Sequence, residues 1–119
     1  MNESVLKLLT DILHAGRRIQ RFLQGVDFEN YASNELLQSA VERQFLIIGE
    51  AMARLGRESP EIFAQINDAA SIVGFRNVLA HGYDVVDSQV VWAAATAHLP
   101  SLLMEVQTML SHVGDQESL

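Results

Sequence analysis

The sequence of residues 34–56, NELLQSAVERQFLIIGEAMARLG, has the residue spacing of one long amphipathic helix. Apolar side chains recur every three or four residues, so they form a continuous stripe along one face. The members of this stripe are Leu37, Ala40, Val41, Phe45, Ile48, Met52 and Leu55. Asn34 precedes the stripe, where its side chain can cap the first turn, and Gly56 follows it. The stretch therefore predicts a long helix that buries one face.

A second helix of similar length is expected before this stretch. Ser4 stands where it can cap a helix over residues 4–24, and Gly25 is placed to end it. Residues 26–33 then read as a linker without helical periodicity. We expect two aromatic side chains to anchor this linker to the core, Phe28 and Tyr31.

Three more helices are expected after residue 56. Ser59 and Pro60 predict the start of a short one, because Ser caps helices and Pro fits their first turn. Asp68 predicts the cap of the next helix, which would carry Arg76 on the side opposite its apolar residues. Its inward residues would be Ile72, Val73, Phe75 and Leu79. A final helix spans about residues 89–112, with Pro100 as the site of a kink.

These elements predict an all-α fold, a compact antiparallel bundle of about five helices with a kinked C-terminal helix. The chain has 119 residues, which suits one domain. We place this domain at residues 1–113 and expect a frayed polar tail at residues 114–119.

Composition limits the possible compartments and sites. The chain has no cysteine, which excludes disulfides and thiolate metal sites. Residues 1–4 lack the basic start of a signal peptide, and no window reaches the ~18 apolar residues that a membrane span needs. We therefore expect a cytoplasmic protein with no membrane association. Asp11 and His14 have helical spacing, but no Glu-x-x-His unit occurs, so neither a metal nor a cofactor is expected.

Residues 76–83, RNVLAHGY, concentrate polar chemistry within an apolar helical pattern. Arg76 is a permanent cation that can fork onto a phosphate, and His81 can exchange a proton near neutral pH. Asn77 can donate to a phosphate oxygen or fix an imidazole tautomer. Residues five apart on a helix lie about 140° apart around its axis, so we expect the helix to end near His81. Gly82 could then turn His81 back toward Arg76. The alternative is a simple favourable interaction of both side chains with the helix dipole.

Glu50 is a carboxylate inside the apolar run IIGEAM of residues 47–52. Carboxylates are seldom buried without a partner, and the simplest partner here is Arg76. Glu50 would then hold the guanidinium in place. The alternative is a solvated carboxylate on the outer face of the helix.

The motif R-N-x-x-A-H-x-Y resembles the Arg-x4-His signature of HEPN-domain ribonucleases, in the branch that pairs with a minimal nucleotidyltransferase as toxin and antitoxin. Further similar motifs extend the resemblance over roughly residues 5–110. They include Asp11-Ile12-Leu13, Ala40-Val41-Glu42-Arg43, Ile47-Ile48-Gly49-Glu50-Ala51, Val91-Trp92 and Leu99-Pro100.

The resemblance implies a ribonuclease toxin that acts as a homodimer, with two Arg-x4-His motifs facing one cleft. It also implies a cognate nucleotidyltransferase antitoxin that adenylylates Tyr83, two places after His81. The alternative for Tyr83 is simple packing over the helix end. The residues favour a metal-independent endoribonuclease that cleaves RNA through attack of the 2′-hydroxyl group. Its catalytic residues would be Arg76, His81 and Asn77.

The net charge of −7 argues against a general RNA-binding protein, because such a surface repels polyanions. A nuclease needs only local positive charge, and seven of the eight basic residues are Arg. These include a cluster at Arg17, Arg18 and Arg21, and three along the next helix at Arg43, Arg54 and Arg57. Each could instead be paired with Asp or Glu on a solvated face. Two other functions stay open: a non-catalytic nucleotide-binding or regulatory subunit of a nucleotidyltransferase, and a purely structural helical dimer.

Overall fold

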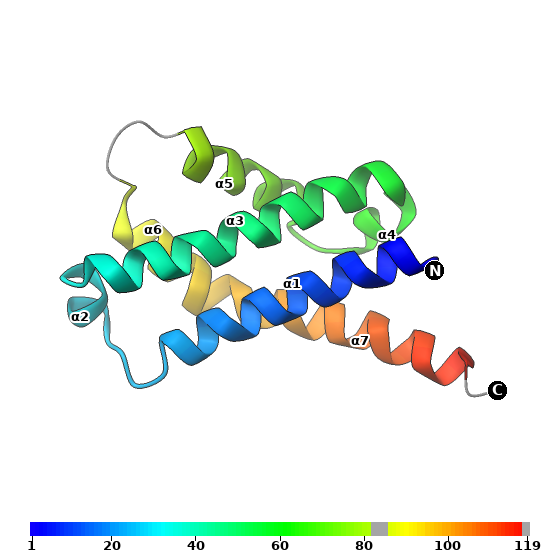
Figure 1. Ribbon diagram of the computed structural model, residues 1–119, viewed down its shortest axis with the longest axis horizontal. Coiled ribbons are helices and arrows are strands. Elements are labelled where there is room, and N and C mark those ends of the chain that lie inside the picture. The colour runs from blue at the N-terminus through cyan, green and yellow to red at the C-terminus, as the bar shows by residue number, and fades with distance from the viewer. Residues whose placement is uncertain (82–85, 118–119) are drawn as a thin grey trace.

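The computed structural model describes residues 1–81 and 86–117, and all regular structure within these ranges is helical. The elements in chain order are α1 (Glu3–Phe22), α2 (Phe28–Ala32), α3 (Glu35–Glu58), α4 (Pro60–Gln65), α5 (Ala69–His81), α6 (Ser88–Ala93), the π-helical segment η1 (Ala94–His98) and α7 (Leu99–Glu117). They form an elongated bundle of 50 × 30 × 19 Å (Figure 1). The predicted all-α class is confirmed.

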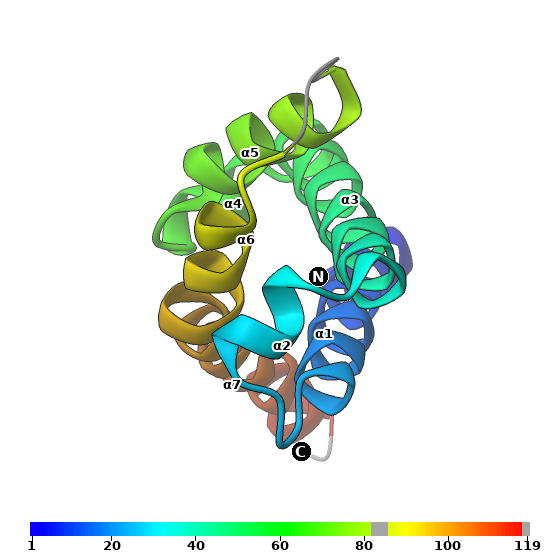
Figure 2. The same ribbon diagram turned by 90° about the vertical axis from the view of Figure 1, so that its left-hand side faces the viewer.

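The core lies where α1, α3 and α7 meet. Helices α1 and α3 run antiparallel and bury their apolar faces, which in α3 is the predicted stripe, while α7 closes the lower side of the bundle (Figures 1 and 2). Side chains without any exposed surface come from all three helices: Leu9, Ile12, Ile19, Val41, Met52, Leu55 and Val106. Their complete removal from water is the main stabilising contribution to this fold.

The start of the long third helix is as predicted, since the Asn34 side chain accepts a hydrogen bond of 3.0 Å from the Leu37 amide. The predicted cap of the first helix is wrong. Asn2 caps α1 by accepting from the Val5 amide, whereas Ser4 lies inside the helix and donates to Glu58 Oε1 at 2.7 Å. Either residue type can cap, and the capping position falls two residues earlier than the apolar spacing suggests.

The predicted linker between the first two long helices contains the short helix α2, capped by Asp27. Its two predicted anchors do pack inward. Tyr31 is fully buried, and both Tyr31 and Phe28 contact the Trp92 ring, with centroid distances of 5.5 and 5.9 Å. Desolvation, with a contribution from the nearby Glu42 carboxylate, raises the pKa of Tyr31 to about 12. The buried Tyr31 hydroxyl has no hydrogen-bond partner among the described residues.

The C-terminal helical segment starts at Ser88, with Asp87 as its cap. Between Ala94 and His98 it widens into π-helical turns, immediately before Pro100. Pro100 lacks an amide hydrogen and crowds the preceding turn of a regular α-helix, so an irregularity here is expected. The segment continues to Glu117, five residues past the predicted end at His112.

Helix α5 lies on the side of α3 away from α1 (Figure 1). The chain reaches it through α4 and a turn at Asp68, whose φ of 62° lies in the left-handed region. The Asp68 carbonyl then accepts from the Ile72 amide at 2.9 Å and starts the helix. Only Ala69 of α5 is buried, although the helix is largely apolar. No helix in the described part of the chain combines the length and hydropathy that a membrane crossing requires.

Candidate active site

Arg76 lies against α3 because residue 49 is glycine. A side chain at position 49 would overlap Cβ and Cγ of Arg76, so the absence of a Cβ lets the two helices approach closely at this point. The prediction that Arg76 projects away from the apolar side of α5 is therefore wrong. Its side chain starts within the α3–α5 contact and is 30% exposed. The predicted inward residues of α5 pack against the core but keep part of their surface exposed.

Two neighbours hold the Arg76 guanidinium. Nη2 lies 3.6 Å from Glu50 Oε1, and Nη1 donates to Asn77 Oδ1 at 2.9 Å. The expected contact between Glu50 and Arg76 is thus present, although the Glu50 side chain is 60% exposed and lies on the outer face of α3. Arg76 Nε is buried and has no partner within the described residues. These contacts orient the guanidinium, which retains unused hydrogen-bonding capacity.

His81 is the last residue of α5, as the motif predicts, and its side chain is exposed. Because α5 is helical from Arg76 through His81, the two residues lie about 140° apart around its axis. The proposed return of His81 toward Arg76 depends on Gly82, which lies outside the described residues. Tyr83, the predicted modification site, also lies outside them.

Arginines other than Arg76 give the molecule local positive charge. Those at positions 17, 18, 21, 43, 54 and 57 are all exposed. The alternative that these arginines pair with Asp or Glu is not found among the side chains described at residues 1–81 and 86–113. The ion pairs in these ranges are Lys7–Asp11 at 2.8 Å and Arg76–Glu50 at 3.6 Å. The other arginines are not neutralised by such contacts.

An open apolar cavity of about 460 Å³ lies between α3, α5 and the α6–η1–α7 segment. Its lining includes Phe45, Ile48, Phe75 and Val90, together with polar residues such as His98. The sequence patterns did not predict this cavity, because the apolar spacing of each helix gives no information on how far apart the helices stand.

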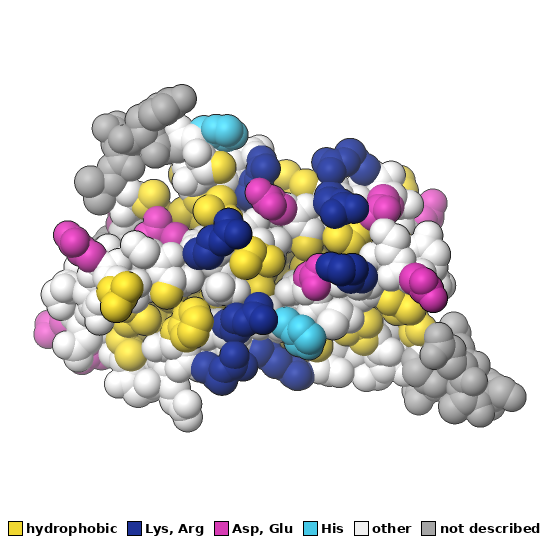
Figure 3. Space-filling model, in the orientation of Figure 1, with side chains coloured by type: hydrophobic (Ala, Val, Ile, Leu, Met, Phe, Trp, Pro, Cys, Tyr) yellow, Lys and Arg dark blue, Asp and Glu magenta, His cyan; other side chains and the backbone are white. Residues whose placement is uncertain are grey.

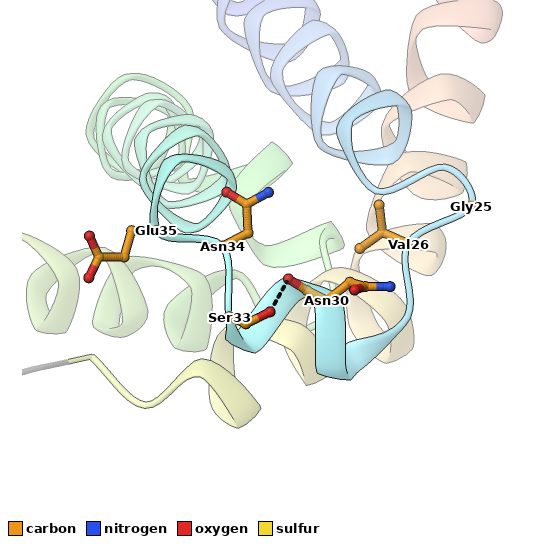
Figure 4. A pocket seen from close by; sticks show the side chains of 6 residues that line it. All are labelled: Gly25, Val26, Asn30, Ser33, Asn34 and Glu35. Atoms are coloured by element: carbon orange, nitrogen blue, oxygen red, sulfur yellow. Dashed lines mark hydrogen bonds between the residues drawn. The ribbon is translucent and has the colours of Figure 1, made fainter.

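A second hollow, shallower and more polar, lies between the end of α1 and the start of α3 (Figure 4). Its polar groups are largely occupied locally, since the Asn34 side chain caps α3 and Ser33 donates to the Asn30 carbonyl at 3.3 Å. It contains no basic side chain. This hollow therefore offers little chemistry for a phosphodiester.

The spacing of Asp11 and His14 does not form part of a larger ligand set. Asp11 accepts a hydrogen bond from Lys7 at 2.8 Å. Over the residues that the structure describes, no three His, Asp or Glu side chains come together as potential metal ligands. Within the described part of the RNVLAHGY motif, the groups available for chemistry are the Arg76 guanidinium, the His81 imidazole and the Asn77 amide.

The chain matches known proteins over most of its length. Residues 12–109 match the model of a family described as Ribonuclease HepT-like. A Methanocaldococcus jannaschii protein provisionally named an RNase is 29% identical, over 87% of this chain and 94% of that protein. A Thermococcus cleftensis protein named a probable ribonuclease HepT is 30% identical, over 86% and 92%. A Caldanaerobacter subterraneus protein, provisionally named an RNase, is 30% identical over 74% and 78%.

Proposed function

The chain belongs to the HepT-like ribonuclease family, and from that premise we propose that it is a metal-independent endoribonuclease that uses Arg76 and His81. Membership of this family confirms the sequence resemblance to HEPN ribonucleases and supports RNA as the substrate. The matched region contains the whole RNVLAHGY motif together with Glu50.

The proposed reaction is an internal transfer at the phosphodiester. An imidazole removes the proton from the 2′-hydroxyl, whose oxygen attacks the adjacent phosphorus. The bond from phosphorus to the 5′-oxygen breaks as the 2′-oxygen bond forms, and a second imidazole protonates the departing 5′-oxygen. The products are a 2′,3′-cyclic phosphate and a 5′-hydroxyl. Arg76 stabilises the charge that accumulates on the phosphoryl oxygens.

The observation that carries this proposal is the contact of the Arg76 guanidinium with two polar side chains. Glu50 and Asn77 each hold one of its terminal nitrogens, at 3.6 and 2.9 Å, and the side chain stays partly exposed. A cation held in advance of the reaction need not reorganise when negative charge develops, which is where electrostatic catalysis gains most. Asn77 and Glu50 act as positioning residues in this scheme.

The position of His81 supports a site built from two copies of the chain. One imidazole cannot readily serve as base and acid in the same cleavage, and His81 projects about 140° from Arg76 around α5. A twofold contact between copies would supply a second imidazole and a second guanidinium to one phosphate. We therefore expect a homodimer, and sedimentation analysis that found a fully active monomer would contradict this part of the proposal.

The third element of the proposal is control by a partner. A cognate nucleotidyltransferase antitoxin would transfer adenylate from ATP to the Tyr83 hydroxyl, with release of pyrophosphate. The added phosphodiester would block the neighbouring site through its bulk and negative charge. Intact-mass spectrometry after co-expression should detect one added adenylate, and this addition should disappear in Tyr83→Phe. An unchanged mass in the presence of an active partner would exclude this form of control.

The central test uses purified chain, labelled RNA and a DNA of the same sequence, with EDTA present throughout. We expect cleavage of the RNA alone, with cyclic-phosphate ends. Arg76→Ala and His81→Ala should each reduce the cleavage rate by about 100-fold or more. A His81→Ala variant that cleaves at the normal rate would refute the mechanism. Nucleotide binding without any cleavage would instead favour a non-catalytic regulatory subunit.

A further inference from the structure

Positive and negative charges are distributed very unevenly over this molecule. All eight Lys and Arg residues lie on α1, α3 and α5, which also carry six Asp and Glu residues, so these helices have a net charge of +2. The rest of the chain has nine acidic residues and no basic one, and together these account for the total of −7. The overall acidity therefore says little about the charge on the face that α1, α3 and α5 form.

Five exposed arginines form a band on this face, three on α3 and two on α1. On α3, Arg43, Arg54 and Arg57 are seven, four and seven residues from Glu50, so they share its outward stripe. Arg18 and Arg21 are three apart on the exposed side of α1. Figure 3 shows Lys and Arg side chains gathered on this face across both helices. We call these five residues the arginine band.

Contacts between the helices fix where the arginine band lies along the bundle. The hydrogen bond from Ser4 to Glu58 marks the antiparallel register of α1 and α3, which puts Arg18 at about the level of residue 44 along the bundle, close to the level of Arg43. The contact of Arg76 with Gly49 sets the register of α5 in the same way. It puts His81 at about the level of residue 44 as well. Arginines from two helices thus lie at the level of the catalytic imidazole.

These guanidiniums are available to a ligand. None of the five forms an ion pair or a side-chain hydrogen bond with a residue that the structure describes. An exposed guanidinium without such a partner can form charge-assisted hydrogen bonds with an anion. Arg17 differs, because it donates to Gln107 on α7 and is thereby engaged within the fold.

We propose that the arginine band binds the phosphate backbone of single-stranded RNA and leads it to the Arg76–His81 site. The inference rests on the proposed ribonuclease function and adds the surface that holds the substrate. Along α3, Arg43 and Arg57 are separated by about 21 Å, enough for several consecutive phosphates. Phe22 follows Arg21 and is 37% exposed, so one base can stack on its ring. Guanidinium groups can bind the phosphates of single-stranded RNA, and an exposed aromatic ring beside them can stack on its unpaired bases.

The test measures binding without cleavage. The full chain carrying His81→Ala is titrated into a fluorescein-labelled single-stranded RNA, and anisotropy gives the affinity at several salt concentrations. In this background Arg18→Ala, Arg43→Ala and Arg54→Ala should each weaken binding. Each should also reduce the slope of log affinity against log salt by about 0.7, the value for one lost contact to a single-strand phosphate. Phe22→Ala should weaken binding without changing that slope.

Arg17→Ala is the matched control, since it removes the same charge from the same helix at a residue engaged with Gln107. It should leave the slope near the parent value. Equal slope changes in Arg17→Ala and the band variants would mean that RNA binding depends only on the net charge of the protein. That result would overturn the proposal. Unchanged RNA binding in the band variants, with loss of binding to the antitoxin protein, would identify a protein-docking surface and also overturn it.

Cleavage by chains with His81 intact is measured in parallel, so that the two proposals can fail separately. Altered slopes in a chain that never cleaves RNA would support the arginine band and refute the catalytic proposal. Normal cleavage that depends on His81, together with unaltered slopes in all band variants, would refute the arginine band alone.

Discussion

Two regions of this molecule differ in how firmly they are held. In the α1–α3–α7 core, side chains such as Leu9, Met52 and Val106 have no exposed surface. In α5, a helix that is just as apolar, only Ala69 is buried, and Val78 is 58% exposed. The residues proposed for catalysis all lie on α5, whereas most of the stabilising burial lies elsewhere. Stability and the proposed chemistry therefore lie largely on different helices.

The two regions meet where Gly49 of α3 touches Arg76 of α5. Loosely packed elements open at lower free energy than the core does, so α5 has the freedom to adjust to a substrate or a second copy. The glycine contact sets the position of the guanidinium despite this freedom. Changes in the core should then affect unfolding, and changes at this contact should affect cleavage. Four variants test that division, from the largest expected effect on stability to the smallest.

Met52→Ala should cause the largest loss of stability. Met52 is fully buried on α3, and its truncation leaves a cavity, which costs about 2–5 kcal/mol in the free energy of unfolding. Urea unfolding followed by Trp92 fluorescence measures this loss. Leu36→Ala on the same helix is the control, since Leu36 is 82% exposed and should change stability by less than about 0.5 kcal/mol. Cleavage per folded molecule should stay near normal in both variants.

Gly49→Ala should reduce both stability and cleavage. The new methyl group would overlap Cβ and Cγ of Arg76 near the α5 backbone, so α5 itself must shift. We expect a loss of about 1–3 kcal/mol, which outweighs the gain of about 1 kcal/mol from the helix propensity of Ala. Gly74→Ala is the matched control on α5, because no atom lies within 4 Å of its added Cβ. It should stabilise the chain by about 0.5–1 kcal/mol. Normal cleavage in Gly49→Ala would show that the contact does not position Arg76.

Tyr31→Phe should stabilise the core by about 1 kcal/mol near neutral pH, because it removes a buried hydroxyl that has no partner among the described residues. The pH dependence gives a second readout. The pKa of Tyr31 is raised from 10.0 to about 12 in the folded chain, so the unfolded chain loses this proton first. Ionisation of this phenol therefore leaves the stability of the chain unchanged below pH 10 and lowers it as the pH rises toward 12.

Urea unfolding of both chains between pH 9 and 12 checks this linkage. The stability of the parent should fall more steeply than that of Tyr31→Phe over this interval, and cleavage at neutral pH should be the same in both. Parallel stability curves would mean that the phenol ionises equally easily in the folded and unfolded chains.

Glu50→Gln should have the smallest effect on stability. The Glu50 side chain is 60% exposed, and an exposed ion pair contributes about 0–1 kcal/mol. Cleavage should respond more strongly, since displacement of a catalytic group by about 1 Å can cost up to 100-fold in rate. We expect kcat to fall about tenfold while KM does not rise, because the substitution removes a negative charge next to the phosphate. A higher KM at unchanged kcat would assign Glu50 to substrate binding.

Much of this fold could be predicted because the long helices carry clear patterns. The apolar stripe and the Asn34 cap of α3 are local features that the rest of the chain does not override. The end of α5 at His81 was likewise predicted from a local feature. Helix α2 was missed because five residues are too few to display helical periodicity. The π-helical segment depends on how the helical stretches before and after it pack against the core, which no local pattern shows. Only Pro100 indicated an irregularity in this helix.

The side on which Arg76 lies could not be predicted from α5 alone. Its apolar residues suggested one buried side, and the polar Arg76 was assigned to the other. The actual position depends on Gly49, 27 residues earlier, where a missing side chain makes room for the arginine stem. Such a complementary fit depends on both helices together, so the sequence pattern of one helix cannot predict it. The Glu50 contact was predicted from a carboxylate in an apolar run, although the structure leaves that carboxylate 60% exposed on the outer face of α3.

The uneven placement of charge along the chain adds an orienting effect to the net charge of −7. Near a polyanion the field would exert a torque that turns the α1–α3 face inward before any contact forms. Beyond about 8 Å, screening at physiological salt leaves only weak repulsion. A practical consequence is that cation-exchange resin should retain the protein even above its isoelectric point near 4.9, bound through one oriented side.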